Sequence, residues 1–418
     1  MPNNPTSYLY IFIHITVHSP NSFQHFYMHV IVTMLSPDAA ARRFAVLHVL
    51  VSLAVSSSFV SADHSNGFEG DRKGVTNKLV PAVFVFGDST VDPGNNEFYP
   101  TIARGNFSPY GVDFPQGIPS GRFCNGRLAP DFIASYLGVK DTIPPYLDPS
   151  LSIDDLVTGV SFASAGSGYD PHTPTVLNVI SMSEQLRYFS EYKTRLEQSI
   201  GKERTQETIE KAIYVVSSGT NDLLFQFAIP GLPLNNVLKY DVSTYQRLIV
   251  DLCKQFTQDL IAQGARKIAI VNTPPIGCIP IVLTINPPLF RDPTEKRSCI
   301  DSLSAITRGY NKLLKVELKA LQSSFITSNH TPVVVYADIY NPFNEFVTNP
   351  EKFGFEVVDR GCCGTGLLEL SFLCNHLLPI CSERSKYIFF DSVHPTEATY
   401  RLLTNALIPV VDFLARHQ

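Results

Sequence analysis

The sequence is poor in several residue types that mark particular protein classes. It has no tryptophan and only four methionines, and charged residues make up 17% of its 418 positions. No run of Lys and Arg occurs and the formal net charge is −5, so the chain offers no basic surface for nucleic acid. No segment recurs at a period of about 20–50 residues, which argues against a solenoid or propeller. The 44% of hydrophobic residues is enough for one large globular core or two small ones.

Motifs of metal and nucleotide sites are missing as well. H-E-x-x-H does not occur, and the histidines after position 62 form no two-histidine cluster. The first expected strand is followed by neither G-x-G-x-x-G nor a P-loop. We therefore expect no metal ion and no cofactor.

The N-terminal residues have the layout of a leader. Arg42-Arg43 precede an apolar run over 44–55, and small residues follow up to Ala62. Charged, apolar and small residues in this order indicate a secretory signal over 34–62, starting at Met34 and cut after Ala62. A membrane anchor is the alternative, but the run is short for a span and no charged stop follows it directly. We expect a secreted protein without a stable membrane span, and residues 1–33 to be an upstream extension.

All eight cysteines come after position 120. The cluster formed by Cys362, Cys363, Cys374 and Cys381 lacks the paired C-x-x-C spacing of a zinc site, so disulfides in an oxidising compartment are the better interpretation. Adjacent Cys362 and Cys363 are expected to pair across the loop with 374 and 381, in a connectivity that stays open, and Cys278 with Cys299.

Two sequons predict N-glycosylation, at Asn106 (Asn106-Phe107-Ser108) and at Asn329 (Asn329-His330-Thr331). A proline follows each sequon, so we expect low occupancy at both.

After position 80, short apolar runs alternate with amphipathic stretches. Dense Val, Ile, Phe and Tyr predict strands over 83–86, 212–216, 267–271 and 333–336. Apolar residues at three-to-four spacing predict helices over 243–263 and 301–324 and after position 394, the first with a Ser243…Gln246 capping box. Such alternation gives an α/β fold, in which helices cover a parallel sheet. No composition break divides 65–415, so we expect one domain there.

The parts of a nucleophilic acyl-transfer site stand at the two ends of this domain. The first strand ends at Gly87-Asp88, and Ser89 follows directly. Near the other end of the domain, Asp391 precedes His394 by three residues. In a parallel sheet, functional residues gather at the carboxyl ends of strands, where Ser89 is expected. A serine, a histidine and an aspartate assemble into triads in several chain orders. An ordinary capped strand-to-helix turn is the alternative interpretation of Gly87-Asp88-Ser89.

Two further segments fall where strands should end. The strand over 212–216 runs into Gly219-Thr220-Asn221-Asp222, where the Asn221 amide either caps a turn or donates to an oxyanion. The small residues over 159–168, which include Gly166, either let a backbone N–H approach the site or form a flexible loop.

Together these blocks resemble the GDSL (SGNH) serine esterases and lipases. Gly87-Asp88-Ser89, Gly166, Gly219-Thr220-Asn221-Asp222 and Asp391-x-x-His394-Pro395 match the four signature blocks in order. Further matches to the secreted plant branch are Asp92-Pro93-Gly94-Asn95-Asn96, Pro109-Tyr110-Gly111, the stretch over 121–126, Pro275-Ile276-Gly277-Cys278 and Cys362-Cys363-Gly364. The stretch over 162–180 resembles the anther-type extracellular lipases in particular.

The resemblance implies an SGNH-hydrolase, flavodoxin-like three-layer sandwich in the apoplast or cell wall. It implies Ser89 as nucleophile, His394 as base, Asp391 as the carboxylate that holds the imidazole, and an oxyanion hole made by the N–H groups of Ser89 and Gly166 with the Asn221 amide. Asp88 takes a structural role. Thr90 replaces the Leu that names the family, and Ser161 stands where many relatives carry Asn. The expected partner is a small or polymer-linked ester; an acyltransferase and a non-catalytic binding protein remain alternatives.

Overall fold

The computed structural model describes residues 11–17, 28–34, 80–230, 240–286, 297–325 and 331–417. The chain divides into two compact units, Met1–Gly74 and Val75–Gln418. In the first unit, β1 (Ile11–Val17) pairs antiparallel with β2 (Met28–Met34), with Ile11 opposite Met34. The signal-like residues 35–62 lie outside the described residues, so the leader and the domain boundaries stay predictions.

The second unit is built on a parallel sheet of four strands in the order β3-β4-β5-β6. The strands are β3 (Val83–Gly87), β4 (Ile213–Ser217), β5 (Lys267–Val271) and β6 (Val333–Ala337). All four predicted strands are confirmed. They are in register, since Phe84 lies opposite Tyr214 and Val215 opposite Ala269, and the carboxyl ends of β3 and β4 therefore meet at one edge.

The free edge of β3 carries a further, irregular segment. The N–H groups of Val83 and Val85 donate to the carbonyls of Thr158 and Val160, and the N–H of Phe162 donates to the carbonyl of Val85. Residues 158–162 thus run parallel to β3 on the side opposite β4. Counting this segment, the spatial order is 2-1-3-4-5, which is the flavodoxin-like order.

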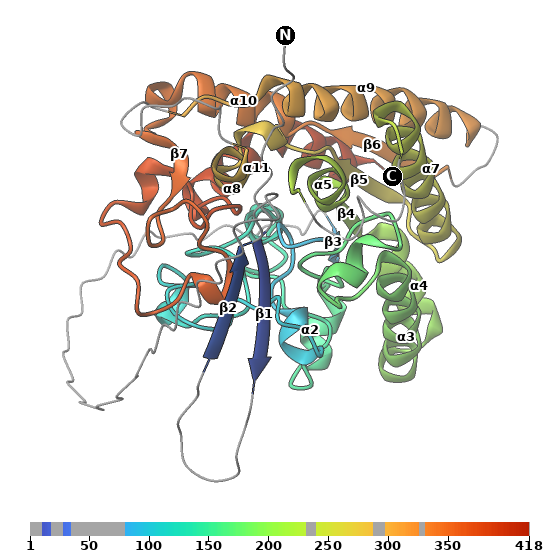
Figure 1. The fold of residues 1–418 in the computed structure, drawn as a ribbon. Coiled ribbons are helices and arrows are strands. Elements are labelled where there is room, and N and C mark those ends of the chain that lie inside the picture. Colours follow the sequence, from blue (N-terminus) through green and yellow to red (C-terminus); the bar gives the residue numbers. More distant parts are fainter. Residues whose placement is uncertain are drawn as a thin grey trace. The chain divides into compact units, whose positions relative to one another are not determined.

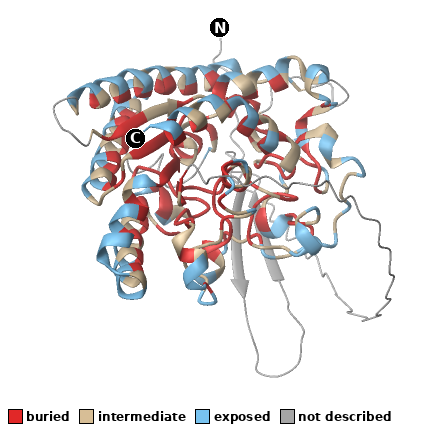
Figure 2. Cartoon of the chain, turned by 180° about the vertical axis from the view of Figure 1, so that it is seen from behind, coloured by how far each residue is buried: buried red, intermediate tan, exposed pale blue. Residues whose placement is uncertain are grey.

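Helices cover both faces of the sheet, which gives three layers (Figure 1). Helices α3 (Met182–Ile200), α7 (Val242–Ala262) and α9 (Asp301–Ser324) pack on one face, and α1 (Ala129–Tyr136) and α11 (Glu397–Arg416) pack on the other. Figure 2 shows the strands buried between helices that expose only their outer sides. The predicted α/β fold with a central parallel sheet is confirmed.

Smaller elements complete the second unit. A short parallel pair joins β7 (Val357–Gly361) to β8 (Tyr387–Phe389). Within the described residues, the other α-helices are α2 (Ile153–Val157), α4 (Lys202–Lys211), α5 (Thr220–Leu223), α8 (Pro280–Ile285) and α10 (Tyr340–Thr348). Within the described ranges, no helix is long and apolar enough to span a membrane.

The N-terminus of α7 differs from the prediction. Asp241, and not Ser243, caps the helix, and its carboxylate accepts the N–H of Thr244 at 2.9 Å. The side chain of Gln246 instead donates to the carbonyl of Ile306 on α9. The predicted capping box is therefore wrong, because the helix begins at Val242 and places Asp241 in the cap position.

The cysteines pair as the sequence suggested. Disulfides join Cys278 to Cys299, Cys362 to Cys381 and Cys363 to Cys374, and the last two resolve the open connectivity. Cys124 and Cys253 are buried free thiols.

Candidate active site

The turn after β3 fixes the position of Ser89. Gly87 has a φ of 138°, and a Cβ there would overlap the backbone of Ser217 on β4, so only glycine fits. The next N–H, from Asp88, donates to the carbonyl of Ser217 at 3.0 Å. These contacts tie the turn to the neighbouring strand and hold Ser89, which is 8% exposed, at the carboxyl edge of the sheet.

Asp88 and Thr90 brace this turn from within. The N–H and hydroxyl of Thr90 both donate to Asp88 Oδ1, at 3.0 and 2.8 Å, and the Thr90 hydroxyl lies 3.0 Å from that of Ser217. A leucine at position 90 could make neither side-chain contact. Burial raises the pKa of Asp88 to about 6, although the hydrogen bonds from Thr90 and the nearby His394 act in the opposite direction.

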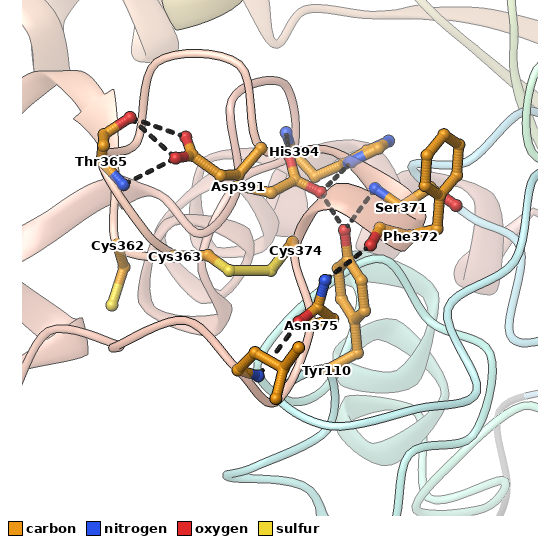
Figure 3. Close-up of a disulfide and its surroundings, with 12 residues drawn as sticks. Tyr110, Cys362, Cys363, Thr365, Ser371, Phe372, Cys374, Asn375, Asp391 and His394 are labelled. Carbon is orange, nitrogen blue, oxygen red and sulfur yellow. Dashed lines mark hydrogen bonds and ion pairs between the residues drawn. A yellow bond between two sulfur atoms is a disulfide. The ribbon is translucent and has the colours of Figure 1, made fainter. Parts of the chain in front are cut away.

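Asp391 and His394 form a tight pair directly before α11 (Figure 3). His394 Nδ1 lies 2.7 Å from Asp391 Oδ2, and Asp391 Oδ1 accepts the N–H groups of Val393 and His394 at 2.8 and 2.6 Å. Asp391 is fully buried and His394 is 4% exposed. The ring of Phe123 packs against the imidazole with centroids 4.9 Å apart. The carboxylate thus holds both the backbone and the ring of the histidine.

Tyr110 is a member of this network to which the sequence analysis assigned no role. Its hydroxyl donates to Asp391 Oδ2 at 2.7 Å and accepts the N–H of Ser371 at 2.9 Å (Figure 3). Burial, and then the adjacent Asp391 carboxylate, raise the pKa of Tyr110 well above its usual value, so the hydroxyl stays a donor. Because 281 positions separate Tyr110 from Asp391, no local pattern predicts the contact.

The segment that contains Gly166 is fixed beside the serine turn. The N–H of Ser164 donates to the carbonyl of Gly87 at 3.0 Å, and the Asn221 Nδ2 group donates to the carbonyl of Ser167 at 2.9 Å. An amide group has two N–H donors, so one of Asn221 is left for another acceptor. Within the described part of the chain, the backbone N–H groups of Ser89 and Gly166 donate to no protein atom.

Asp222 links the same two segments, a role that the sequence analysis did not predict. Its carboxylate accepts the N–H groups of Tyr169 and Asp170 at 2.8 and 3.1 Å. Ser161, which departs from the family pattern expected from the sequence, donates to the carbonyl of Val91 at 3.0 Å. The loop at Gly166 therefore keeps its supports despite that departure.

A pocket opens at this end of the sheet. Ser89, Asn221 and His394 all line it, whereas Gly166 is not among its lining residues. The cavity itself has a volume of about 70 Å³. Most of its wall is apolar, with side chains from β4, α1 and α11 such as Val215, Ile133, Leu403 and Leu407. No hydrogen bond joins the described side chains of Ser89 and His394; such catalytic contacts are often long before substrate binds.

The sequon at Asn106 lies on an exposed residue, and Asn329 lies outside the described residues. Both glycosylation sites stay predictions. Across the described ranges, no group of three or more His, Cys, Asp and Glu side chains could hold a metal ion.

Comparison with known proteins identifies relatives over most of the chain. The family model of GDSL-like lipases and acylhydrolases matches residues 83–407. The chain is 49% identical over 333 residues to GDSL esterase/lipase At5g45960 of Arabidopsis thaliana, covering 80% of this chain and 87% of that protein. It is 44% identical to GDSL esterase/lipase At1g20120 of the same plant, covering 79% and 80%. Among solved structures, an acetylxylan esterase from Geobacillus stearothermophilus aligns at 11% identity with a TM-score of 0.36, covering 81% of this chain and 97% of that one.

Proposed function

Because the chain belongs to the GDSL-like lipases and acylhydrolases, a family of carboxylic ester hydrolases, we propose that it hydrolyses acyl esters with Ser89, His394 and Asp391 as its triad. The observation that carries the proposal is the 2.7 Å contact between His394 Nδ1 and Asp391 Oδ2 at the wall of a pocket that Ser89 also lines.

In the proposed mechanism, Ser89 Oγ attacks the ester carbonyl carbon while His394 Nε2 takes the hydroxyl proton. The Nδ1–H of His394 donates a hydrogen bond to Asp391, which keeps Nε2 unprotonated and free to act as base. His394 then returns the proton to the departing alcohol, leaving an acyl group on Ser89. A water molecule repeats the sequence and releases the acid.

The tetrahedral intermediate needs donors that are already in place. The proposed donors are the N–H groups of Ser89 and Gly166 and the second N–H of Asn221. Support comes from the free backbone N–H groups and from the bond that holds the Asn221 amide to Ser167. Losing one such donor typically costs about 3–4 kcal/mol of transition-state stabilisation.

The lining of the pocket favours esters with an apolar acyl group. Tyr400, Leu403 and Leu407 all line it, and seven residues of helix span about 10 Å. The apolar wall therefore continues along α11, away from His394. Pockets lined mostly by apolar side chains, with a few polar groups that orient the ligand, suit small apolar ligands.

We also propose that the protein is secreted, as the leader layout suggests and as three disulfides in the described residues support. Placement near the anther-type extracellular lipases is a further proposal that rests on the stretch over 162–180.

The proposal is tested with purified mature protein and p-nitrophenyl esters of short and medium chain length. Turnover is expected, and Ser89→Ala should lower kcat by about four to six orders of magnitude. A fluorophosphonate probe should label Ser89 in the wild type alone. Turnover that survives in Ser89→Ala, or labelling elsewhere, would contradict the proposal. Product analysis with added glycerol separates hydrolysis from acyl transfer, because only transfer yields new glycerol esters.

A further inference from the structure

The loop over 362–381 displays an unusual number of apolar side chains. Leu368, Phe372, Leu373 and Leu377 are between 46% and 59% exposed, and we call these four side chains the apolar loop patch. Among the described residues, they are a third of the large hydrophobic side chains that are exposed, gathered within ten positions. Singly exposed apolar residues are normal, whereas gathered ones mark interaction sites.

Charge is nearly absent from this surface. The loop has two ionisable side chains, Glu369 and His376. Glu369 is half-buried, and its oxygens accept from the loop's own groups: the Thr365 N–H and hydroxyl and the N–H of Leu367 and Leu368. The loop therefore offers no Lys or Arg to an anionic ligand, and its one ionisable side chain besides Glu369 is the exposed His376.

The loop is fixed and lies directly behind the Asp391–His394 pair. Disulfides Cys362–Cys381 and Cys363–Cys374 close it. The carbonyl of Glu369 accepts the N–H of Ser392 at 2.8 Å, and the N–H of Ser371, next to Phe372, donates to Tyr110, which holds Asp391 (Figure 3). The exposed side chains thus belong to the segment that supports the triad.

The Ser371 side chain joins a further exposed residue to this region. Its hydroxyl donates to the carbonyls of Arg104 and Ile102 at 2.8 and 3.3 Å. The Ile102 side chain is 67% exposed, so the apolar surface continues from the loop onto a second segment of the chain.

We propose that the apolar loop patch binds the surface of aggregated, uncharged ester substrate, such as an oil droplet, and so brings the site to it. The inference rests on the proposed function. Three observations favour this occupant: the patch is aliphatic apart from one phenylalanine, it carries no charge, and it adjoins the triad. Protein partners are usually bound through Trp, Tyr and Arg, and Leu is under-represented at such hot spots; the patch has none of the first three.

The test compares two double variants with matched exposure. Phe372→Ser/Leu377→Ser removes side chains that are 54% and 59% exposed, and Phe413→Ser/Val316→Ser removes side chains of the same exposures on α11 and α9. Each protein is mixed with a trioctanoylglycerol emulsion, and the fraction that floats with the droplets is measured. Hydrolysis of the emulsion and of soluble p-nitrophenyl acetate is measured in parallel.

The patch variant should bind and hydrolyse the emulsion at least tenfold less than the wild type, with p-nitrophenyl acetate turnover within twofold. The control variant should behave like the wild type. The inference would be overturned if the patch variant floated as well as the wild type, or if the control variant lost flotation to the same extent. It would also be overturned if the patch variant kept its flotation but lost a dimer seen for the wild type in size-exclusion chromatography. A wild type that floats but turns over no ester would instead count against the proposed function. Leu368→Ser/Leu373→Ser repeats the test should the first pair unfold.

Discussion

The two faces of the central sheet are formed by the same strands but carry different kinds of side chain. Toward α3 and α7, Phe84 and Phe86 join Phe189, Tyr192 and other rings whose centroids lie 5–6 Å apart. Toward α1 and α11, the strands present smaller aliphatic side chains. The pocket is lined by side chains of this second face such as Val215 and Leu407, and also by Phe389 and Leu403 of the cluster that contains Phe84.

Alternation along a strand makes this division possible. Successive side chains point to opposite faces, so one strand can present aromatic side chains on one face and small aliphatic side chains on the other. Aromatic packing provides area and fixed geometry on the closed face. Valine and leucine on the other face leave space next to Ser89. On β4, therefore, Val216 belongs to the closed aromatic core, while its neighbour Val215 lines the pocket.

The strongest test of this division uses two adjacent residues of β4. Val215 lines the pocket and Val216 belongs to the aromatic core. Val215→Phe should fill the pocket and lower kcat/KM for octanoate esters by two to three orders of magnitude, since about one methylene in a pocket already changes rates 10–200-fold. Acetate esters should be affected much less.

Val216→Phe serves as the matched partner of that variant. It should lower the free energy of unfolding by about 1–3 kcal/mol or more, because the core has no room for a ring. The ratio of octanoate to acetate turnover should stay unchanged. Urea unfolding and ester kinetics on both variants measure the two outcomes; a Val216→Phe protein with altered chain preference would disprove the separation of the two faces.

The pocket face also carries a buried ionisable group, Asp88, whose pKa is raised to about 6. Between about pH 4 and pH 6, the native state keeps a proton that the unfolded chain has lost. The free energy of unfolding should therefore fall as pH rises through this window, by on the order of 3 kcal/mol for this group, and level off above it.

Asp88→Asn keeps an acceptor for Thr90 and should remove that part of the slope. Urea unfolding at pH 4, 5, 6 and 7 measures it. Asp141→Asn, at an exposed position, is the control and should follow the wild type. Equal slopes in wild type and Asp88→Asn would contradict the assignment.

A smaller effect separates two buried tyrosines. The Tyr214 hydroxyl on the aromatic face donates to the carbonyl of Ile209 at 2.8 Å, whereas the Tyr110 hydroxyl donates to Asp391. Tyr110→Phe should lower kcat about tenfold with KM unchanged, the loss expected from removing one hydrogen bond to a charged group. The acid limb of the pH–activity profile should also move to higher pH, because a carboxylate with one donor fewer holds the protonated imidazole more tightly.

Tyr214→Phe should cost about 1 kcal/mol of unfolding free energy and leave kcat and the pH profile unchanged. If Tyr110→Phe changes only stability, as Tyr214→Phe is expected to do, then the Tyr110 hydroxyl is a structural contact and not a positioning group for the triad.

Much of the fold follows from short-range patterns. The four strands of the main sheet are dense in Val, Ile, Phe and Tyr and were predicted to within a residue or two. The helix over 301–324 was predicted at its observed bounds. The helix after position 394 was predicted as well, but its buried side was not. Leu407, Val411 and Leu414 face the sheet, while Ala406 and Phe413 are exposed. Pro409 and the apolar residues on several sides of this helix make its inward face ambiguous from periodicity alone.

Contacts between segments that are distant in the sequence could not be predicted from it. Ser89, Asn221, Asp391 and His394 were identified through motif resemblance, but Tyr110 and Asp222 act through partners that are 281 and about 50 positions away. Asp222 stands in a recognised block, yet only the fold shows that its carboxylate anchors the loop at Gly166. The pocket could not be predicted from the sequence either, because its wall combines side chains from β4, α1 and α11, which are far apart along the chain.

The segment over 158–162 protects one edge of the sheet from pairing with other protein molecules at high concentration. An uncovered outer strand presents a row of unpaired peptide groups, which is a template for strands of other molecules and a route to aggregation. On the β3 side that row is occupied by Thr158, Val160 and Phe162. A neighbouring molecule therefore finds no open template there, and close association on a shared surface does not extend the sheet from one chain into the next along that side.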